Sequence, residues 1–204
     1  MFYKGKLPEQ KQPSVAVIGA RECSEYGRFV AEELGRYLGS QGIQVISGMA
    51  RGIDGISQQA ALLAGGTSYG VLGCGVDICY PRQNRKLYEE LIQKGGLLST
   101  YAPETKALPA YFPPRNRIVS GLADALIVIE ARQKSGTLIT VDMALEQGKD
   151  VYVVPGRITD RLSDGCNRLL TQGAGVFLSP ESFTEEFLRN WEEKQELHRR
   201  IAQK

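Results

Sequence analysis

The sequence predicts an α/β fold, an open and mostly parallel sheet with helices on both faces. Short apolar runs rich in β-branched residues alternate with helix-period segments from residue 14 to about residue 180. Glycine is abundant, with 23 copies among 204 residues, and the copies cluster where turns would join these segments. The 42% apolar and 24% charged content is ordinary for a globular protein and excludes a chain that is disordered throughout.

The expected elements follow one another along the chain. Strands are expected at residues 14–18, 44–47, 68–72, 97–100, 125–130, 151–154 and 176–178. Helices are expected at residues 24–39, 55–64, 84–94, 115–121, 138–147 and 165–172, and several end near a glycine that can form a left-handed cap. We therefore expect a Rossmann-like domain over residues 14–180. Residues 1–13 are expected to form a linker or the end of a missing domain, and residues 181–204 a charged helix.

Membrane and metal-dependent functions are not expected from this sequence. No stretch reaches the ~18 uninterrupted apolar residues of a membrane helix, and the first residues lack the apolar run of a signal peptide. We therefore expect a cytoplasmic protein. The four cysteines form no Cys-x-x-Cys pair and His198 is the single histidine, so neither a zinc site nor a disulfide is expected.

The segments that follow the first five strands each carry positive charge. In an open parallel sheet, ligands bind outside the carboxyl ends of the strands, where these segments meet. Glycine lets the backbone approach an anion, and a guanidinium binds phosphate oxygens through two parallel donors. This edge is therefore a candidate phosphate site, although ordinary solvated loop arginines are the alternative. The cations are Arg21, Arg51, Arg82, Arg85, Lys86, Lys106, Arg115, Arg117, Arg132 and Lys134.

Common nucleotide cofactors do not fit these loops. A dinucleotide fingerprint would place G-x-G-x-x-G after the first strand, but Arg21 stands where the second glycine belongs. No G-x-x-x-x-G-K-[ST] string occurs, which excludes a P-loop. His198 lies in the charged tail, where the base of a serine-hydrolase triad is not expected. We therefore expect no cofactor and no catalytic triad.

Two features favour a polynucleotide ligand over a small nucleotide. Cations spread over several strand ends, about 5 Å apart per strand, would form a track along the sheet edge. Aromatic side chains in the same loops could stack on unpaired bases, and Phe112 is the best candidate. The alternative for each aromatic residue is packing against a helix end. The aromatic residues are Tyr80, Tyr101, Tyr111 and Phe112.

Five blocks of sequence resemble, in order, the central domain of the DNA-processing protein A family, also called DprA or Smf. They are VAVIGARECSEYG, SGMARGID, CGVDICYPRQN, FPPRNRIVSGLADALIVIEA and SGTLITVDMALEQGKDVYVVPG, and they cover about residues 14–179. The resemblance implies an extended Rossmann-like fold that binds single-stranded DNA, acts as a homodimer and is not an enzyme. It also implies that the protein protects incoming DNA and loads the RecA recombinase during natural transformation.

The resemblance also implies roles for individual residues. The dimer face is expected within residues 164–176, although core packing of its leucines is the alternative. The expected dimer contacts are Asn167, Leu170 and Val176. With Arg51 and Lys106 added from the strand exits, the expected nucleic-acid-binding residues are Arg21, Arg51, Arg82, Lys106, Phe112, Arg115, Asn116, Arg117, Ser135, Gly136 and Thr137.

Several positions depart from the family pattern or allow a structural role. Gln58 stands where members usually carry His, and Pro109 occupies the slot of a basic residue. Ser135 can hold a phosphate together with its neighbours or simply cap a helix, which contributes about 1 kcal/mol. For Arg115 and Arg117 the structural alternative is an ion pair, with Asp124 or Asp77 as the partner.

Two other functions stay open at this level. One is an enzyme or sensor that binds a small nucleotide or ribosyl phosphate at the same edge. Related folds that hydrolyse sugars use Gly-Thr-x-x-Glu, but Thr140 stands where that glutamate would be, which disfavours hydrolysis. The other is an interaction scaffold without a ligand.

Overall fold

The computed structural model describes residues 1–202, apart from the side chains of residues 198 and 202. One sheet of eight strands runs through the molecule in the order β1-β5-β4-β3-β2-β6-β7-β8. Strand β1 (Phe2–Gly5) pairs antiparallel with β5 (Gly96–Ser99), whereas all other neighbours in the sheet are parallel. The predicted open, mostly parallel α/β sheet is therefore confirmed.

The remaining elements alternate as expected for crossover connections. The other strands are β2 (Ser14–Ile18), β3 (Gln44–Ser47), β4 (Ser68–Val71), β6 (Ala125–Val128), β7 (Asp150–Val153) and β8 (Gly175–Val176). The α-helices are α1 (Glu25–Ser40), α2 (Ile53–Leu63), α3 (Arg85–Lys94), α4 (Phe112–Leu122), α5 (Gly136–Glu146), α6 (Asp164–Thr171) and α7 (Pro180–Ala202). Two short 3-10 helices, η1 (Arg82–Asn84) and η2 (Pro109–Tyr111), precede α3 and α4.

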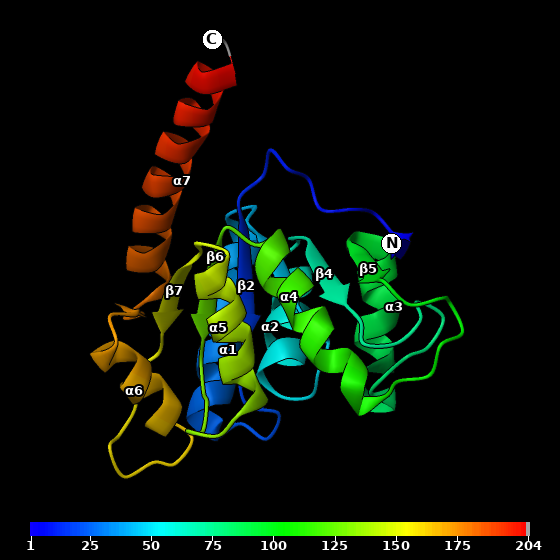
Figure 1. Ribbon diagram of the computed structural model, residues 1–204, viewed down its shortest axis with the longest axis horizontal. Helices are drawn as coiled ribbons and strands as arrows, with labels where there is room; N and C mark the ends of the chain where they lie inside the picture. The colour runs from blue at the N-terminus through cyan, green and yellow to red at the C-terminus, as the bar shows by residue number, and fades with distance from the viewer. Residues whose placement is uncertain (203–204) are drawn as a thin grey trace.

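Helices cover both faces of the sheet, as the apolar composition of the strands requires (Figure 1). Val15 and Val17 of β2 point toward one layer, where they pack with residues of α1, α2 and α7. Ala16 and Ile18 point to the other layer and pack with residues of α4, α5 and α6. Helix α3 packs on β4 and β5, where Leu91 and its neighbours form a third apolar cluster.

Strand β1 lies in a segment that the sequence predicts to be a linker or the end of a missing domain. It is four residues long and mostly exposed, and it pairs with a strand more than ninety positions away, through Tyr3 and Leu98 among others. Such a short, exposed edge strand has no apolar alternation that sequence inspection could detect. Residues 2–5 are thus part of the sheet and not part of a linker.

Helix α4 begins three residues earlier than predicted. Its first turn contains Pro113 and Pro114, which the sequence pattern places before the helix. Proline is compatible with the first turn, because the backbone donors there have no partner inside the helix. The earlier start places Phe112 at the first position of α4, at the carboxyl-end edge of the sheet.

The order of the strands creates a crevice beside β2. Strand β2 lies between β3 and β6, and the chain leaves β2 toward α1 on one face but leaves β6 toward α5 on the other. Such a reversal opens a crevice at the carboxyl ends of the two strands. The Thr137 hydroxyl donates to the Gly19 carbonyl across it at 3.3 Å. The crevice is therefore bounded by the exits of β2 and β6.

Helix α7 is anchored to the body by its first half. Phe183 and Phe187 are buried, and Phe183 contacts the ring of Tyr152 edge-on with centroids 4.9 Å apart. Its second half extends beyond the body toward the C-terminus (Figure 1). No helix in the described residues is both long and apolar enough to cross a membrane.

Candidate nucleic-acid interface

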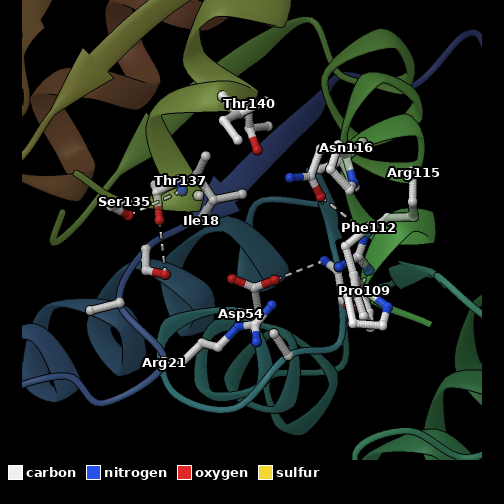
Figure 2. A pocket seen from close by; sticks show the side chains of 18 of the residues that line it. Ile18, Arg21, Asp54, Pro109, Phe112, Arg115, Asn116, Ser135, Thr137 and Thr140 are labelled. Carbon is white, nitrogen blue, oxygen red and sulfur yellow. Dashed lines mark hydrogen bonds between the residues drawn. The ribbon is translucent and has the colours of Figure 1, made fainter. Parts of the chain in front are cut away.

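Two hollows adjoin each other at the carboxyl ends of the strands. The first hollow, of about 530 Å³, occupies the crevice between β2 and β6 and extends to the start of α5 (Figure 2). The second hollow, of about 410 Å³, extends from it toward η1. The two share several lining residues and form one continuous depression. The shared residues are Arg21, Gly48, Ala50, Tyr80, Phe112 and Arg115.

Three arginines around this depression are exposed and have no acidic partner. Arg21 follows β2, Arg51 precedes α2, and Arg82 opens η1. Across residues 1–202, no carboxylate forms a salt bridge with any of these three side chains. A free guanidinium of this kind can bind a phosphate without first giving up an internal ion pair. Three separate segments thus bring unpaired positive charge to one place.

Phe112 forms an aromatic platform in the middle of the depression. Its ring is half-buried and lies 5.7 Å from the Tyr80 ring, centroid to centroid. The Arg21 guanidinium carbon lies 5.7 Å from the same ring centroid. Gly73 supports the ring, because a Cβ at this position would lie 2.8 Å from Phe112 Cδ1. An accessible aromatic ring beside free arginines is the combination that binds unpaired bases and their phosphates.

Arg115 has a different environment from the other arginines. Its side chain is only 5% exposed, and Nη1 donates to the carbonyls of Gly48, at 2.5 Å, and Val71. Nε also donates to Asn116 Oδ1 at 3.1 Å. These bonds tie α4 to the ends of β3 and β4. Arg115 therefore positions the segment that carries Phe112, and most of its donors are already in use.

Asp54 is a buried acidic residue whose negative charge acts on this guanidinium. It lies at the start of α2, is 8% exposed, and its Oδ2 accepts from the Gly48 amide at 3.1 Å. Burial raises the pKa of the Asp54 carboxyl, while the nearby Arg115 charge opposes the rise. Burial likewise lowers the pKa of Arg115, and Asp54 opposes that change. Two buried groups of opposite charge thus line the first hollow, and each opposes the effect of burial on the pKa of the other.

The start of α5 forms the far wall of the first hollow (Figure 2). Ser135 Oγ accepts from the Thr137 amide at 3.0 Å, which is the ordinary geometry of a helix N-cap. The space beside the Gly136 Cα is open, since a Cβ built at this position would meet no atom within 4 Å. Helix N-termini favour nearby anions because their backbone donors are unpaired. Asn116 lines the same hollow from α4.

Two of the predicted DNA-binding cations lie outside the depression. Lys106 is exposed but lines neither hollow. Arg117 points away and pairs with Glu146 Oε2 of α5 at 2.9 Å. Arg117 therefore forms an ion pair, as its structural alternative predicts, but its partner is Glu146 and not Asp124 or Asp77. Asp124 is engaged elsewhere, with Ser14, and Asp77 pairs with Lys4.

The predicted aromatic residues divide into two pairs. Tyr80 and Phe112 line both hollows. Tyr101 and Tyr111 instead stack on each other, with ring centroids 4.1 Å apart. The second pair thus has a structural contact of its own, which differs from the expected alternative of packing against a helix end.

The residues expected at the dimer face lie near the β8 end of the sheet. The Asn167 side chain forms two hydrogen bonds with the Gly156 backbone. Its Oδ1 accepts from the Gly156 amide at 3.2 Å, and its Nδ2 donates to the Gly156 carbonyl at 3.0 Å. Leu170 packs partly against the core. Val176 is 50% exposed on the edge strand β8. Of the three, Val176 offers the most free apolar surface.

Two supporting glycines and the buried Asp54 were not predicted as site residues. Gly48 and Gly73 follow β3 and β4, and the signal that could have found them is a glycine placed directly after an apolar strand. Gln58 stands where the family usually has a histidine. It is buried and bonds the Met49 amide and the Tyr69 carbonyl, each at 3.1 Å, so its role is to join α2 to the loops after β3 and to β4.

Comparison with known proteins identifies the family. The model of the family described as DNA recombination-mediator protein A matches residues 1–188. This chain belongs to that family. It is 42% identical over 187 residues to DNA processing protein DprA of Streptococcus pneumoniae, and the aligned region covers 92% of this chain and 66% of the relative. It is 39% identical to DprA of Bacillus subtilis over 187 residues, covering 91% of this chain and 63% of the relative.

Solved structures of DprA proteins share this fold. The X-ray structure of DprA from Streptococcus pneumoniae matches with a TM-score of 0.86 at 42% identity, covering 91% of this chain and 65% of that one. DprA from Helicobacter pylori matches with a TM-score of 0.84 at 31% identity, covering 92% and 86%. The latter structure is described as giving insight into a unique single-stranded DNA binding mode. This chain spans about two thirds of the two curated DprA relatives.

Proposed function

We propose that this chain binds single-stranded DNA in the depression formed by the first and second hollows. The observation that supports this most is the meeting of Arg21, Arg51 and Arg82, which come from three separate segments, around the Phe112 ring. None of the three has a carboxylate partner among the described residues. The Helicobacter pylori relative, whose structure concerns single-stranded DNA binding, supports the same ligand.

The physical basis of binding is phosphate neutralisation together with base stacking. Arg21 and Arg82 would each take a phosphate oxygen, and the Phe112 ring would stack against an unpaired base. Stacking on an aromatic ring contributes about 1–3 kcal/mol per base and tolerates any sequence. A duplex keeps its bases paired and inaccessible to Phe112, so the depression favours single strands.

The wider role that we propose is that of a recombination mediator. In this role the chain protects incoming DNA, acts as a homodimer and loads the RecA recombinase in the cytoplasm during natural transformation. The family description as a recombination mediator supports this role. For the homodimer, the exposed side chains of Val176 and Leu178 at the β8 end of the sheet supply apolar surface, at 50% and 77% exposure.

We also propose that the chain acts by binding and not by catalysis. Asp54 is the single carboxylate that lines the first and second hollows in the described chain, and it is buried, with Oδ2 accepting from the Gly48 amide. A general base needs access to the atom from which it takes a proton. Thr140, on the wall of the first hollow, supplies no carboxylate for hydrolysis.

Fluorescence anisotropy with labelled oligo-dT tests this function. Arg21→Ala and Arg82→Ala should each weaken binding at least several-fold, while Arg189→Ala on α7, also exposed, should not. The thermal midpoints of all three variants should stay near wild type. Each phosphate that is no longer neutralised should reduce the slope of log affinity against log salt by about 0.7. Unchanged affinity in both Arg21→Ala and Arg82→Ala would overturn the proposal.

The rival nucleotide enzyme is tested with the same preparation. Wild-type protein is incubated with nucleoside monophosphates, and released base is measured by chromatography. A binding protein should release none. Release of base that is abolished in Asp54→Asn would establish the enzyme instead.

A further inference from the structure

A third hollow, of about 610 Å³, lies among the helices on the α1–α3 face of the sheet. Residues of α2 line it along most of that helix, including Ile56, Ala60 and Leu63. Helix α1 contributes Arg28, Glu32 and Arg36. The end of η1 and the start of α3 contribute Gln83, Asn84, Lys86 and Leu87. The proposed function makes no use of this hollow.

The third hollow adjoins the second. Gln83 lines both of them. On the α2 side, Arg51 lines the second hollow and the next residue, Gly52, lines the third. The two hollows are therefore neighbours across η1 and the start of α2. A chain lying in the depression reaches the third hollow by passing Arg82 and Gln83.

The walls of the third hollow carry more positive than negative charge. Arg28, Arg36 and Lys86 line it with side chains that are 51%, 59% and 82% exposed, and Glu32 is the acidic residue of the lining. Arg28 and Arg36 are two turns apart on α1, about 12 Å along the helix. The positive charge is thus distributed along the hollow, as an extended anion requires.

Two of these cations are only loosely paired. The Arg28–Glu32 and Lys86–Glu90 distances are 4.0 and 3.9 Å, beyond hydrogen-bond length. Glu90 instead accepts from Gln59 Nε2 at 2.6 Å. The Arg28–Glu32 pair is exposed on both sides, and such pairs contribute about 0–1 kcal/mol, so a phosphate can replace Glu32 at little cost. Lys86 is 82% exposed and its side chain is free to turn toward a phosphate. Arg36, in contrast, is hydrogen-bonded to Glu33.

We propose that the third hollow is a second binding site for the same DNA strand. The strand leaves the depression past Arg82 and continues along α2, with its phosphates near Arg28 and Lys86. This inference rests on the proposed function. The lining contains aliphatic side chains such as Ile56 and Leu63 but no aromatic ring. Binding there therefore depends on phosphates, and it is independent of sequence and sensitive to salt.

Dependence on strand length tests this second site. The probes are a short oligo-dT of roughly six nucleotides and a long one of roughly twenty, measured by anisotropy at two salt concentrations. The test variant is Arg28→Glu with Lys86→Glu. Its control, Arg189→Glu with Arg199→Glu on α7, changes the net charge equally at exposed positions. Wild-type protein should bind the long probe more tightly and with a steeper salt slope than the short one.

The test variant should bind the long probe about fivefold or more weakly, with a salt slope lower by about 1.4 because two phosphates are no longer neutralised. Its affinity for the short probe should match that of the control. If the test variant binds the long probe as tightly as wild-type protein does, the inference is overturned. The third hollow would then serve another partner, such as an acidic protein segment. Equal weakening with both probes would also overturn the inference.

A different measurement, the affinity of Arg82→Ala for the short probe, shows whether the proposed function itself fails. In that case Arg82→Ala leaves the affinity for the short probe unchanged. Because the short probe reports on the first and second hollows alone, the two failures are separable.

Discussion

The two ends of the parallel strands both carry a hollow lined by cations, but the cations differ in their partners. At the carboxyl ends, Arg21 and Arg82 have no acidic partner in the described residues. At the amino ends, a hollow of about 370 Å³ beneath α7 contains Lys149 and Lys194. Lys194 pairs with Asp150 Oδ2 at 2.9 Å, and Lys149 Nζ lies 3.5 Å from the Gly121 carbonyl. The size of a hollow and the presence of cations therefore do not define a binding site.

Backbone polarity explains the difference between the two ends. The amino ends of the strands lie beside helix C-termini, where unpaired carbonyls attract cations, and Gly121 is near the end of α4. The carboxyl ends lie beside helix N-termini, where a cation is unfavourable unless an anion is present. Lys149 and Lys194 at the amino ends thus have partners within the fold, as do Arg115 and Arg117 at the carboxyl ends, whereas Arg21 and Arg82 have no acidic partner among the described residues.

The largest expected effect is the loss of stability in Arg115→Ala. The Arg115 guanidinium is buried and donates to the Gly48 and Val71 carbonyls, so its removal leaves two buried acceptors without a donor, at about 1–3 kcal/mol each. The buried Asp54 carboxylate also loses a nearby positive charge. The free energy of unfolding is measured by denaturant titration, with Arg82→Ala as the matched exposed arginine. A loss of unfolding free energy below about 1 kcal/mol would mean that Arg115, like Arg82, contributes little to stability. That result would break the distinction between buried and exposed arginines.

A smaller effect is expected from Gly73→Ala. The added Cβ would lie 2.8 Å from Phe112 Cδ1, so the ring must move. Overpacking of this kind costs about 1–3 kcal/mol, and we expect oligo-dT affinity to fall several-fold with the displaced platform. Gly121→Ala is the control, because its Cβ would lie 3.4 Å from its nearest neighbour, Gln147 Nε2. Wild-type affinity in Gly73→Ala would contradict the role assigned to Phe112.

The smallest effect is expected from Lys194→Ala at the amino ends. Its pair with Asp150 is exposed on both sides, 56% and 54%, so its removal should change stability by at most about 1 kcal/mol. Oligo-dT affinity should equal that of wild type in the anisotropy assay. Weakening as large as in Arg82→Ala would show that both ends of the sheet bind DNA.

The positions of the parallel strands and their helices were predictable from sequence. Each buried strand is a short apolar run bounded by turn residues, as at Val15–Ile18, and this signal is local. The convergence of Arg21, Arg51 and Arg82 was also predictable, because parallel strands bring their carboxyl ends to one edge. Strand β1 escaped prediction because its hydrogen-bond partner, β5, is remote in sequence.

The sequence by itself determined the alternating elements and the edge at which the arginines gather. It did not distinguish Arg115 from Arg21, because the two side chains have the same chemistry and both follow the predicted strands. Only the tertiary structure decided that Arg115 is buried against the carbonyls of Gly48 and Val71, while Arg117 meets Glu146. The physical reason is that a guanidinium's partners are set by contacts between residues far apart in the chain, which appear only when the helices pack on the sheet.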